Sequence, residues 1–190
     1  MRNLNKRKYL TEDEVKLIIN TARCGKHALR NECLIQLCFI HGFRASEISL
    51  LKLSDVNVNS GVVHIKRLKG GLSTTHPLLE CEKNIIEKWL NARSFWSNSA
   101  SPSFFISQKG GSLSRQQIYN IIKKCGVLAG IKVPLHPHML RHSCGFALAN
   151  SGKDTRLIQD YLGHRNIQHT VIYTASNAAR FFGVWDSSIF

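Results

Sequence analysis

The chain reads His-Pro-His-Met-Leu-Arg-His over residues 136–142, and this stretch decides which fold the rest of the sequence supports. Proline is tolerated in the first turn of a helix, so Pro137 predicts a helix over about 138–151. That helix carries His138 and Arg141 three residues apart, which makes them neighbours on its surface. The stretch therefore predicts a helix that presents a histidine and an arginine together.

The residue types in and around this stretch are those that phosphoryl transfer requires. An arginine binds a phosphate through two donors, and a histidine moves protons near neutral pH. A tyrosine hydroxyl is a nucleophile that can become covalently bonded to phosphorus. Leu162-Gly163-His164 and Tyr173 lie downstream, and Arg44 lies far upstream within His41-Gly42-Phe43-Arg44-Ala45-Ser46-Glu47. Together they favour phosphoryl transfer on a nucleic acid without a metal.

The charge of the chain points to the same class of partner. Lysine and arginine number 26 against 12 acidic residues, which gives a formal net charge of +14 over 190 residues. Such an excess favours a polyanion, and nucleic acid is the first candidate. A ribosomal or otherwise generally basic protein is the alternative. The hydrophobic fraction of 43% and the length suit one domain with a real core.

The sequence predicts a cytosolic protein. No apolar run approaches the roughly 20 residues of a membrane span, and no apolar signal region follows the basic residues 1–8. The cysteines form no C-x-x-C pair, so we expect free thiols in core positions and no zinc site. These cysteines are Cys24, Cys33, Cys38, Cys81, Cys125 and Cys144.

Periodicity and capping residues predict a mainly helical fold with one small antiparallel β-sheet, an α+β chain. Two strands, over 61–66 and 73–78, flank a turn at 69–71, and residues 104–106 are expected to form a short buried strand. Helices are expected from Thr11, over about 28–42, 45–51, 81–92 and 114–128, at 138–151, from Asp154 or Thr155 to Gly163, around 170–173, and over about 176–184.

His138-x-x-Arg141, Leu162-Gly163-His164 and Tyr173, with Arg44 upstream and a lysine on a hairpin, resemble the catalytic domain of the tyrosine recombinases, the lambda-integrase family. The similarity is closer still to the small recombinases that invert the fimbrial promoter switch of enteric bacteria. It runs from about Tyr9 to the end of the chain. The matching stretches of that subgroup are residues 67–69, 73–78, 113–117 and 154–177.

The resemblance assigns a role to five of these residues. Arg44 and Arg141 are expected to clamp the scissile phosphate, because guanidinium groups stay charged and offer forked donors. Tyr173 is the expected nucleophile, forming a 3′-phosphotyrosyl link and freeing a 5′-hydroxyl. His138 is expected to act as general base toward Tyr173, and His164 to contact a phosphate oxygen.

A lysine on the hairpin completes the expected set. The resemblance assigns protonation of the leaving 5′-oxygen to Lys69, with Lys66 on the preceding strand as the rival. Because the phosphotyrosyl ester retains the bond energy, no ATP, metal or other cofactor is implied. Strand exchange follows when the 5′-hydroxyl of a partner strand attacks that ester.

DNA contacts beyond the phosphate are expected from the helix at 115–128 and from the hairpin. Amides and arginine can read base edges in a major groove, although an exposed polar helix face is the simpler interpretation. Lys66, Arg67 and Lys69 are expected to follow the DNA backbone. The residues expected on the helix are Arg115, Gln116, Gln117, Lys123 and Lys124.

Several alternatives stay open at the residue level. His138 and His142 lie four residues apart and have the spacing of metal ligands. We expect His142 instead to support Arg141 or the fold, His136 to be a turn residue, and Tyr161 to pack in the core. Three other functions compete with DNA inversion: an integrase or excision recombinase of a mobile element, a non-catalytic DNA-binding regulator, and a metal-dependent nuclease.

The expected domain organisation is a basic arm over 1–9 followed by a recombinase catalytic domain over 10–190. The separate N-terminal core-binding domain of typical family members is not expected. Double-stranded DNA with inverted-repeat sites, a tetramer on that DNA and accessory DNA-bending proteins are the partners that the resemblance implies, at the nucleoid. The apolar segment 176–190 is expected to pack on a neighbouring protomer, or on its own core.

Overall fold

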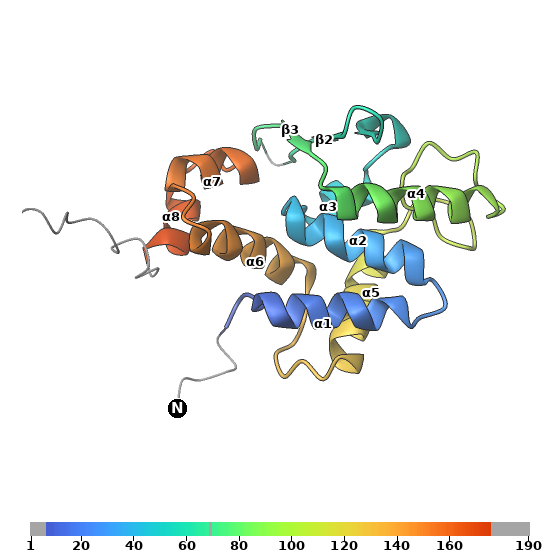
Figure 1. Cartoon of the computed structure of the whole chain (residues 1–190), viewed down its shortest axis with the longest axis horizontal. Helices are drawn as coiled ribbons and strands as arrows, with labels where there is room; N and C mark the ends of the chain where they lie inside the picture. The colour runs from blue at the N-terminus through green and yellow to red at the C-terminus, as the bar shows by residue number, and fades with distance from the viewer. Residues whose placement is uncertain (1–6, 69, 176–190) are drawn as a thin grey trace, which may run out of the picture.

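The computed structural model describes residues 7–68 and 70–175, which form a mainly helical fold with one small sheet (Figure 1). This confirms the expected fold class. The elements are α1 (Glu12–Arg23), α2 (Ala28–Ile40), α3 (Ala45–Ser49), the 3₁₀ turn η2 (Leu53–Asp55), β1 (Val56–Asn57), β2 (Val62–Ile65), β3 (Thr74–Pro77), α4 (Glu80–Ser94), α5 (Arg115–Leu128), α6 (Pro137–Asn150), α7 (Thr155–Leu162) and α8 (Gln168–Thr174).

Capping residues fix where several helices begin and end. Thr11 forms a capping box with Glu14 at the start of α1, and Ser114 begins α5 in the same way. Asp154 caps α7, and Gly163 ends that helix with φ of +67°, a conformation that favours glycine. These caps appear in the sequence as local signals, so the observed boundaries lie within about two residues of the predicted ones.

Helix α2 is the centre of the main core. It packs against α1, α4 and α6, so apolar residues are needed around most of its circumference (Figure 1). Its buried residues include Cys33, Leu34, Ile35, Leu37 and Cys38. A second, smaller cluster joins α6, α7 and α8 through Cys144, Ala149, Ile158, Leu162 and Tyr173. The C-terminal helices therefore have a core of their own beside α2.

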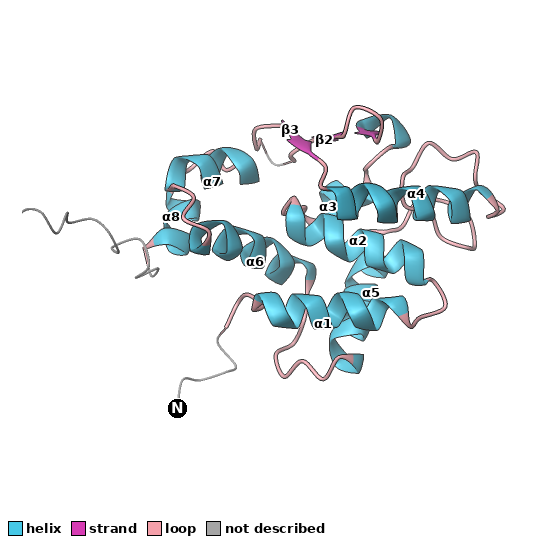
Figure 2. Ribbon diagram, in the orientation of Figure 1, coloured by secondary structure: helices cyan, strands magenta, loops and turns pink. Residues whose placement is uncertain are grey.

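The sheet is antiparallel, with the strand order β1-β2-β3. Strands are magenta in Figure 2, where β2 and β3 are labelled. In β2 and β3, Val63 pairs with His76 and Ile65 with Thr74, so the expected hairpin is confirmed. The short strand β1 was not predicted, because two paired residues carry no periodicity. β3 contacts α7, which brings the hairpin to the C-terminal helices.

Two sequence expectations are wrong. Residues 104–106 are buried but form no strand, because the pairing there is limited to the isolated bridges Lys52–Ser103 and Ile106–Ser112. Cys24 and Cys81 are exposed rather than in the core. The helix expected over 176–184 lies outside the described residues. No helix in the described part of the chain is both long and apolar enough to cross a membrane.

Candidate active site

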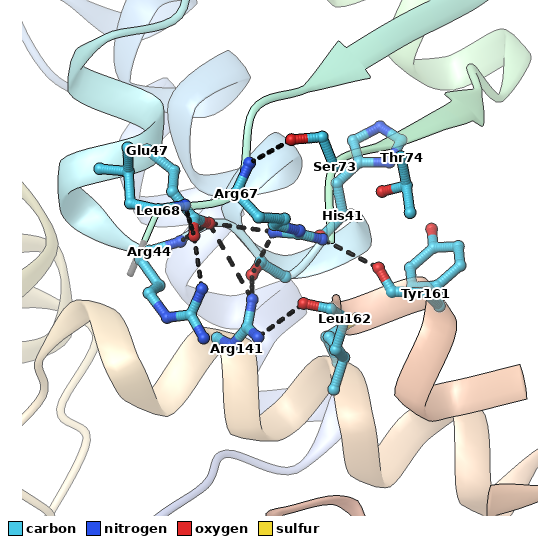
Figure 3. Close-up of polar contacts among 12 residues, drawn as sticks. His41, Arg44, Glu47, Arg67, Leu68, Ser73, Thr74, Arg141, Tyr161 and Leu162 are labelled. Atoms are coloured by element: carbon cyan, nitrogen blue, oxygen red, sulfur yellow. Dashed lines mark hydrogen bonds and ion pairs between the residues drawn. The ribbon is translucent and has the colours of Figure 1, made fainter. Parts of the chain in front are cut away.

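Arg44 and Arg141 come from distant parts of the chain and lie side by side (Figure 3). Gly42 turns the chain at φ +59° after α2, which places Arg44 at the start of α3. From α6, Arg141 donates Nη1 to the carbonyl of Gly42 (2.6 Å) and Nη2 to that of Leu162 (2.7 Å). The structure thus brings together the two arginines to which the family resemblance assigns one phosphate.

The positive charge at this point is only partly compensated. Burial, followed by the charges of Arg67 and Arg44, lowers the pKa of Arg141 to about 9. Repulsion among three guanidinium groups is relieved by a bound anion, because an opposite charge favours the charged form. The cluster is therefore suited to hold a phosphate.

Glu47 organises the arginines and was not singled out from the sequence. Both of its oxygens are buried; Oε1 accepts from Arg44 Nη1 and Oε2 from Arg67 Nη1 (3.0 Å). Burial alone would raise the pKa of Glu47, but the hydrogen bond from the Arg44 backbone and the charges of Arg67 and Arg44 lower it. The available signal was its position three residues after Arg44, on the same short helix.

The expectation that Arg67 follows the DNA backbone is wrong. Its guanidinium is buried, and besides Glu47 it reaches the carbonyls of His41 (2.8 Å), Gly42 (3.2 Å) and Tyr161 (2.9 Å) (Figure 3). Carbonyls in the last turn of a helix lack intrahelical partners, and α2 and α7 both end here. Arg67 therefore joins the hairpin to both helix ends.

The hairpin loop is pressed against the end of α7. A Cβ on Gly71 would lie 2.8 Å from the carbonyl oxygen of Gly163, and one on Gly163 would lie 2.5 Å from that of Leu72. Lys69, in this loop, lies outside the described residues. Lys66 is exposed and pairs with Asp55 at 2.8 Å. The choice between the two lysines stays a prediction.

Tyr173 on α8 is buried against α6. Its ring lies over Gly145, and its hydroxyl oxygen is 3.0 Å from Nδ1 of His142. Burial raises the pKa of Tyr173 to about 12. His142 thus lies within hydrogen-bond distance of the expected nucleophile, a contact that sequence reasoning missed. His138, one turn earlier, is exposed, and its ring centre lies 6.5 Å from that of His142.

His164 follows the turn at Gly163 and packs beside the same tyrosine. Its ring is nearly parallel to that of Tyr173 at 6.5 Å, and Nδ1 is 2.9 Å from Oγ1 of Thr170. Burial, then the charges of Arg141 and Arg44, lowers the pKa of His164 to about 3. The imidazole is therefore neutral at pH 7 and lies near the arginine pair.

The start of α5 faces His138 across an open cleft of about 600 Å³. Arg115, Gln116 and Tyr119 line the cleft from α5, and His136 lines it as the residue before α6. The other predicted DNA contacts on this helix are exposed as well, but Gln117 also accepts from the backbone of Ser114 in the capping box. Lys123 and Lys124 lie further along α5.

One structural expectation can be checked beside the site. Tyr161 is half-buried, stacks on His76 at 3.9 Å and donates its hydroxyl to the carbonyl of Ile40, which confirms a packing role. Within residues 7–68 and 70–175, no group of three or more His, Cys, Asp or Glu side chains is placed to hold a metal ion.

Comparison with known proteins agrees with this geometry. The chain is 58% identical to the type 1 fimbriae regulatory protein FimB of Escherichia coli (strain K12), over 95% of this chain and 90% of that protein. It is 50% identical to FimE of the same strain, over 96% and 93%.

Solved structures agree as well, although this chain spans only part of their length. The XerA recombinase superimposes with a TM-score of 0.80 at 28% identity, over 90% of this chain and 61% of that one. XerH bound to its difH substrate gives 0.79 at 25%, over 95% and 55%. Residues 8–180 match the phage integrase family. With its arginine pair and buried tyrosine in the arrangement described, the chain belongs to that family.

Proposed function

We propose that this protein is a site-specific tyrosine recombinase that cleaves and rejoins DNA through a 3′-phosphotyrosyl intermediate and inverts a fimbrial promoter element. The observation that carries the proposal is the meeting of Arg44 and Arg141, with Tyr173 packed against the helix that supplies Arg141. Identity to two fimbrial regulatory proteins over nearly the whole chain supports the choice of target.

The reaction is a transesterification. The non-bridging oxygens of the scissile phosphate lie between Arg44 and Arg141, where developing charge is stabilised. Oη of Tyr173 bonds to phosphorus, the bond from phosphorus to the 5′-oxygen breaks, and Lys69 supplies a proton to that oxygen. The tyrosine proton passes to a histidine of α6, for which the family resemblance favours His138. Attack by a 5′-hydroxyl of the partner strand reverses these steps.

DNA lies across the face that carries the cleft. Arg115 and Gln116 are exposed beside His138, so a duplex with its phosphate at the arginine pair places base edges near the start of α5. Lys123 and Lys124 supply contacts to the DNA backbone. Inverted-repeat DNA, a tetramer assembled through the apolar segment 176–190, and accessory bending proteins complete the reaction at the nucleoid.

The first experiment uses DNA nicked beside the scissile position, so that cleavage traps the covalent complex. A protein–DNA band in a denaturing gel is expected for the unsubstituted protein in EDTA and is absent for Tyr173→Phe. Tyr161→Phe is the matched control, because that hydroxyl only donates to a carbonyl, and it keeps the band. Binding without a covalent band would favour a regulator.

A second experiment separates inversion from mobile-element excision. A plasmid carrying the two sites as inverted repeats is compared with one carrying them as direct repeats, in host extract that supplies bending proteins. Inversion of the first plasmid is expected to dominate. Preferred excision from the second would identify an integrase-type enzyme instead.

A further inference from the structure

The segment that precedes α1, residues 7–10, lies against α6. The backbone N–H of Leu10 donates to Oγ of Ser143 at 2.7 Å, and both residues are buried. Arg7 forms an ion pair with a glutamate of α1, and its guanidinium lies over the ring of Tyr9, 5.9 Å from the ring centre. The segment is therefore attached at both ends, with Tyr9 held between the two attachments.

Three aromatic rings in a row connect this segment to the expected nucleophile. The ring centres of Tyr9 and Phe146 are 4.0 Å apart, with 32° between the ring planes. Phe146 in turn meets the ring of Tyr173 edge to face, at 5.1 Å and 80°. Phe146 is three residues after Ser143, so the two side chains share one face of α6. Residues 7–10 thus reach Tyr173 through a single side chain of that helix.

Tyr173 depends on its neighbours for its position. It lies on α8, which has seven residues, and an isolated helix this short is not stable in water. Gly145 leaves space for its ring, since a Cβ there would lie 2.6 Å from Cε2, and Phe146 contacts the same ring. Phe146 is only half-buried, so the ring of Tyr9 restricts the rotamers that it can adopt. Tyr9 therefore fixes one of the surfaces on which Tyr173 packs.

The same segment also lies near the hydroxyl end of Tyr173. Nδ1 of His142 is 3.0 Å from that hydroxyl oxygen. Burial, and then nearby charges that include Lys8, lower the pKa of His142 to about 4. Residues 7–10 are therefore close to both the ring and the reacting end of the nucleophile.

We propose that Tyr9 is a positioning residue for the nucleophile: it holds Phe146, and Phe146 holds the phenol of Tyr173 where its oxygen can reach phosphorus. The inference rests on the proposed recombinase function and gives the segment before α1 a part in it. The effect of Tyr9 falls on the rate of cleavage rather than on DNA affinity, because the group that it supports is the attacking one.

The first experiment compares Tyr9→Phe, which keeps the ring, with Tyr9→Ala, which removes it. Single-turnover formation of the covalent complex on nicked DNA is expected to stay near the unsubstituted rate in Tyr9→Phe. In Tyr9→Ala it is expected to slow about 10-fold, the factor that corresponds to the strength of one aromatic pair. DNA affinity is expected to change little. Tyr9→Leu, which keeps apolar volume without a ring, replaces Tyr9→Ala if that variant does not fold.

Two further variants separate positioning from a loss of stability. Phe146→Leu already breaks the connection between Tyr9 and Tyr173, so adding Tyr9→Ala to it is expected to slow cleavage no further. Trp96→Ala is the matched control, because it removes a ring that packs on Trp89 at 5.2 Å. Trp96 follows the end of α4 that lies away from α8 (Figure 1). This control is expected to lower the melting temperature and to leave the cleavage rate unchanged.

A measurement without DNA follows the ring itself. Placing 3-fluorotyrosine at position 173 gives a fluorine NMR resonance whose chemical shift depends on the neighbouring ring of Phe146. Tyr9→Ala is expected to move or broaden this resonance, whereas Tyr9→Phe is expected to preserve it. The control Trp96→Ala is expected to preserve it as well.

Four outcomes would overturn the inference: cleavage by Tyr9→Ala at the unsubstituted rate, an equal loss of rate in Trp96→Ala, additive slowing in the double variant with Phe146→Leu, or an unchanged fluorine resonance in Tyr9→Ala. Failure of the recombinase function itself looks different. The unsubstituted protein would then form no covalent complex, while the fluorine resonance would still report how Tyr9 affects the ring of Tyr173.

Discussion

Gly145 leaves the space that the ring of Tyr173, the proposed nucleophile, occupies. The phenol ring of Tyr173 fills the volume that any side chain at position 145 would occupy. Glycine within a helix normally costs about 1 kcal/mol of stability relative to alanine. Here the absence of a side chain lets the ring of Tyr173 pack on α6, with its hydroxyl 3.0 Å from Nδ1 of His142.

Gly145→Ala is therefore expected to displace the ring and to slow covalent complex formation about 100-fold, since small misplacements of reacting groups have effects of that size. DNA affinity should change little. Gly126→Ala is the matched control: its Cβ would overlap Leu135 at 2.6 Å, but far from the tyrosine. Single-turnover cleavage with nicked DNA checks both variants. An equal loss in both would mean that the effect is general destabilisation.

Single residues were predictable where a motif carries them and unpredictable where packing decides. Arg44, Arg141 and Tyr173 follow from spacing and resemblance alone. The contact between His142 and Tyr173 depends on the distance between α6 and α8, which no local pattern contains. Arg67 was misassigned because charged residues on hairpins are usually exposed, and its burial needs carbonyls from two distant helix ends.

At the scale of elements, one buried side chain docks the hairpin. The guanidinium of Arg67 bonds to carbonyls at the ends of α2 and α7 and neutralises part of the charge on Glu47. Docking of this hairpin also sets where its loop approaches the arginine pair. The stability of the site and the position of the loop therefore depend on the same group.

Removing one partner of a buried ion pair costs about 3–5 kcal/mol, because the other charge stays buried. Arg67→Met is expected to lower the free energy of unfolding by about that amount. Lys66 is the neighbour of Arg67 and is itself exposed, although its partner Asp55 is buried. Because Asp55 keeps a hydrogen bond from the backbone of Lys52, Lys66→Met should cost about 1 kcal/mol or less. Urea unfolding of both variants measures the difference. Comparable losses would contradict the tethering role of Arg67.

Element boundaries were predictable where capping chemistry is local. Thr11, Ser114, Asp154 and Gly163 each mark a helix end in the sequence and in the structure. The apolar run over 104–106 led to the wrong prediction of a strand, because burial alone does not distinguish a strand from a buried loop. Its backbone makes isolated bridges and no ladder, a pairing choice that depends on which segments lie nearby.

At the scale of the molecule, buried neutral histidines couple stability to pH. Burial, and then the neighbouring His41 and Arg67, lower the pKa of His76 to about 3, and burial has the same effect on His164. An unfolded histidine titrates near 6.5, so the unfolded chain binds more protons between pH 6.5 and 3. The contribution of these groups is complete above pH 6.5 and is lost as the pH falls.

The free energy of unfolding is therefore expected to fall by about 1.4 kcal/mol per pH unit for each of the two histidines below pH 6. Urea unfolding at pH 7, 6 and 5 measures the slope. His76→Gln should reduce this pH dependence of the free energy of unfolding by the contribution of one histidine. A stability that stays constant from pH 7 to pH 5 would show that these imidazoles take up protons without cost.

Fold class was accessible from the sequence because periodicity, caps and one hairpin signal agreed with the family resemblance. The sequence did not predict how the main hydrophobic core and the smaller C-terminal cluster pack against each other. The main core surrounds α2, the smaller one joins α6 to α8, and Arg141 reaches across to both Gly42 and Leu162. These contacts form only when the helices have assembled, so no local sequence pattern predicts them.

The hydrogen bonds at the carbonyl of Gly42 join residues that are synthesised at different times. That oxygen receives Arg67 and, 99 residues further along, Arg141. A ribosome releases the N-terminal part first, so Arg44 emerges well before its partner, and Tyr173 is translated later still. In the proposed mechanism, a nascent chain that ends before Tyr173 therefore lacks the group that would form the bond to phosphorus.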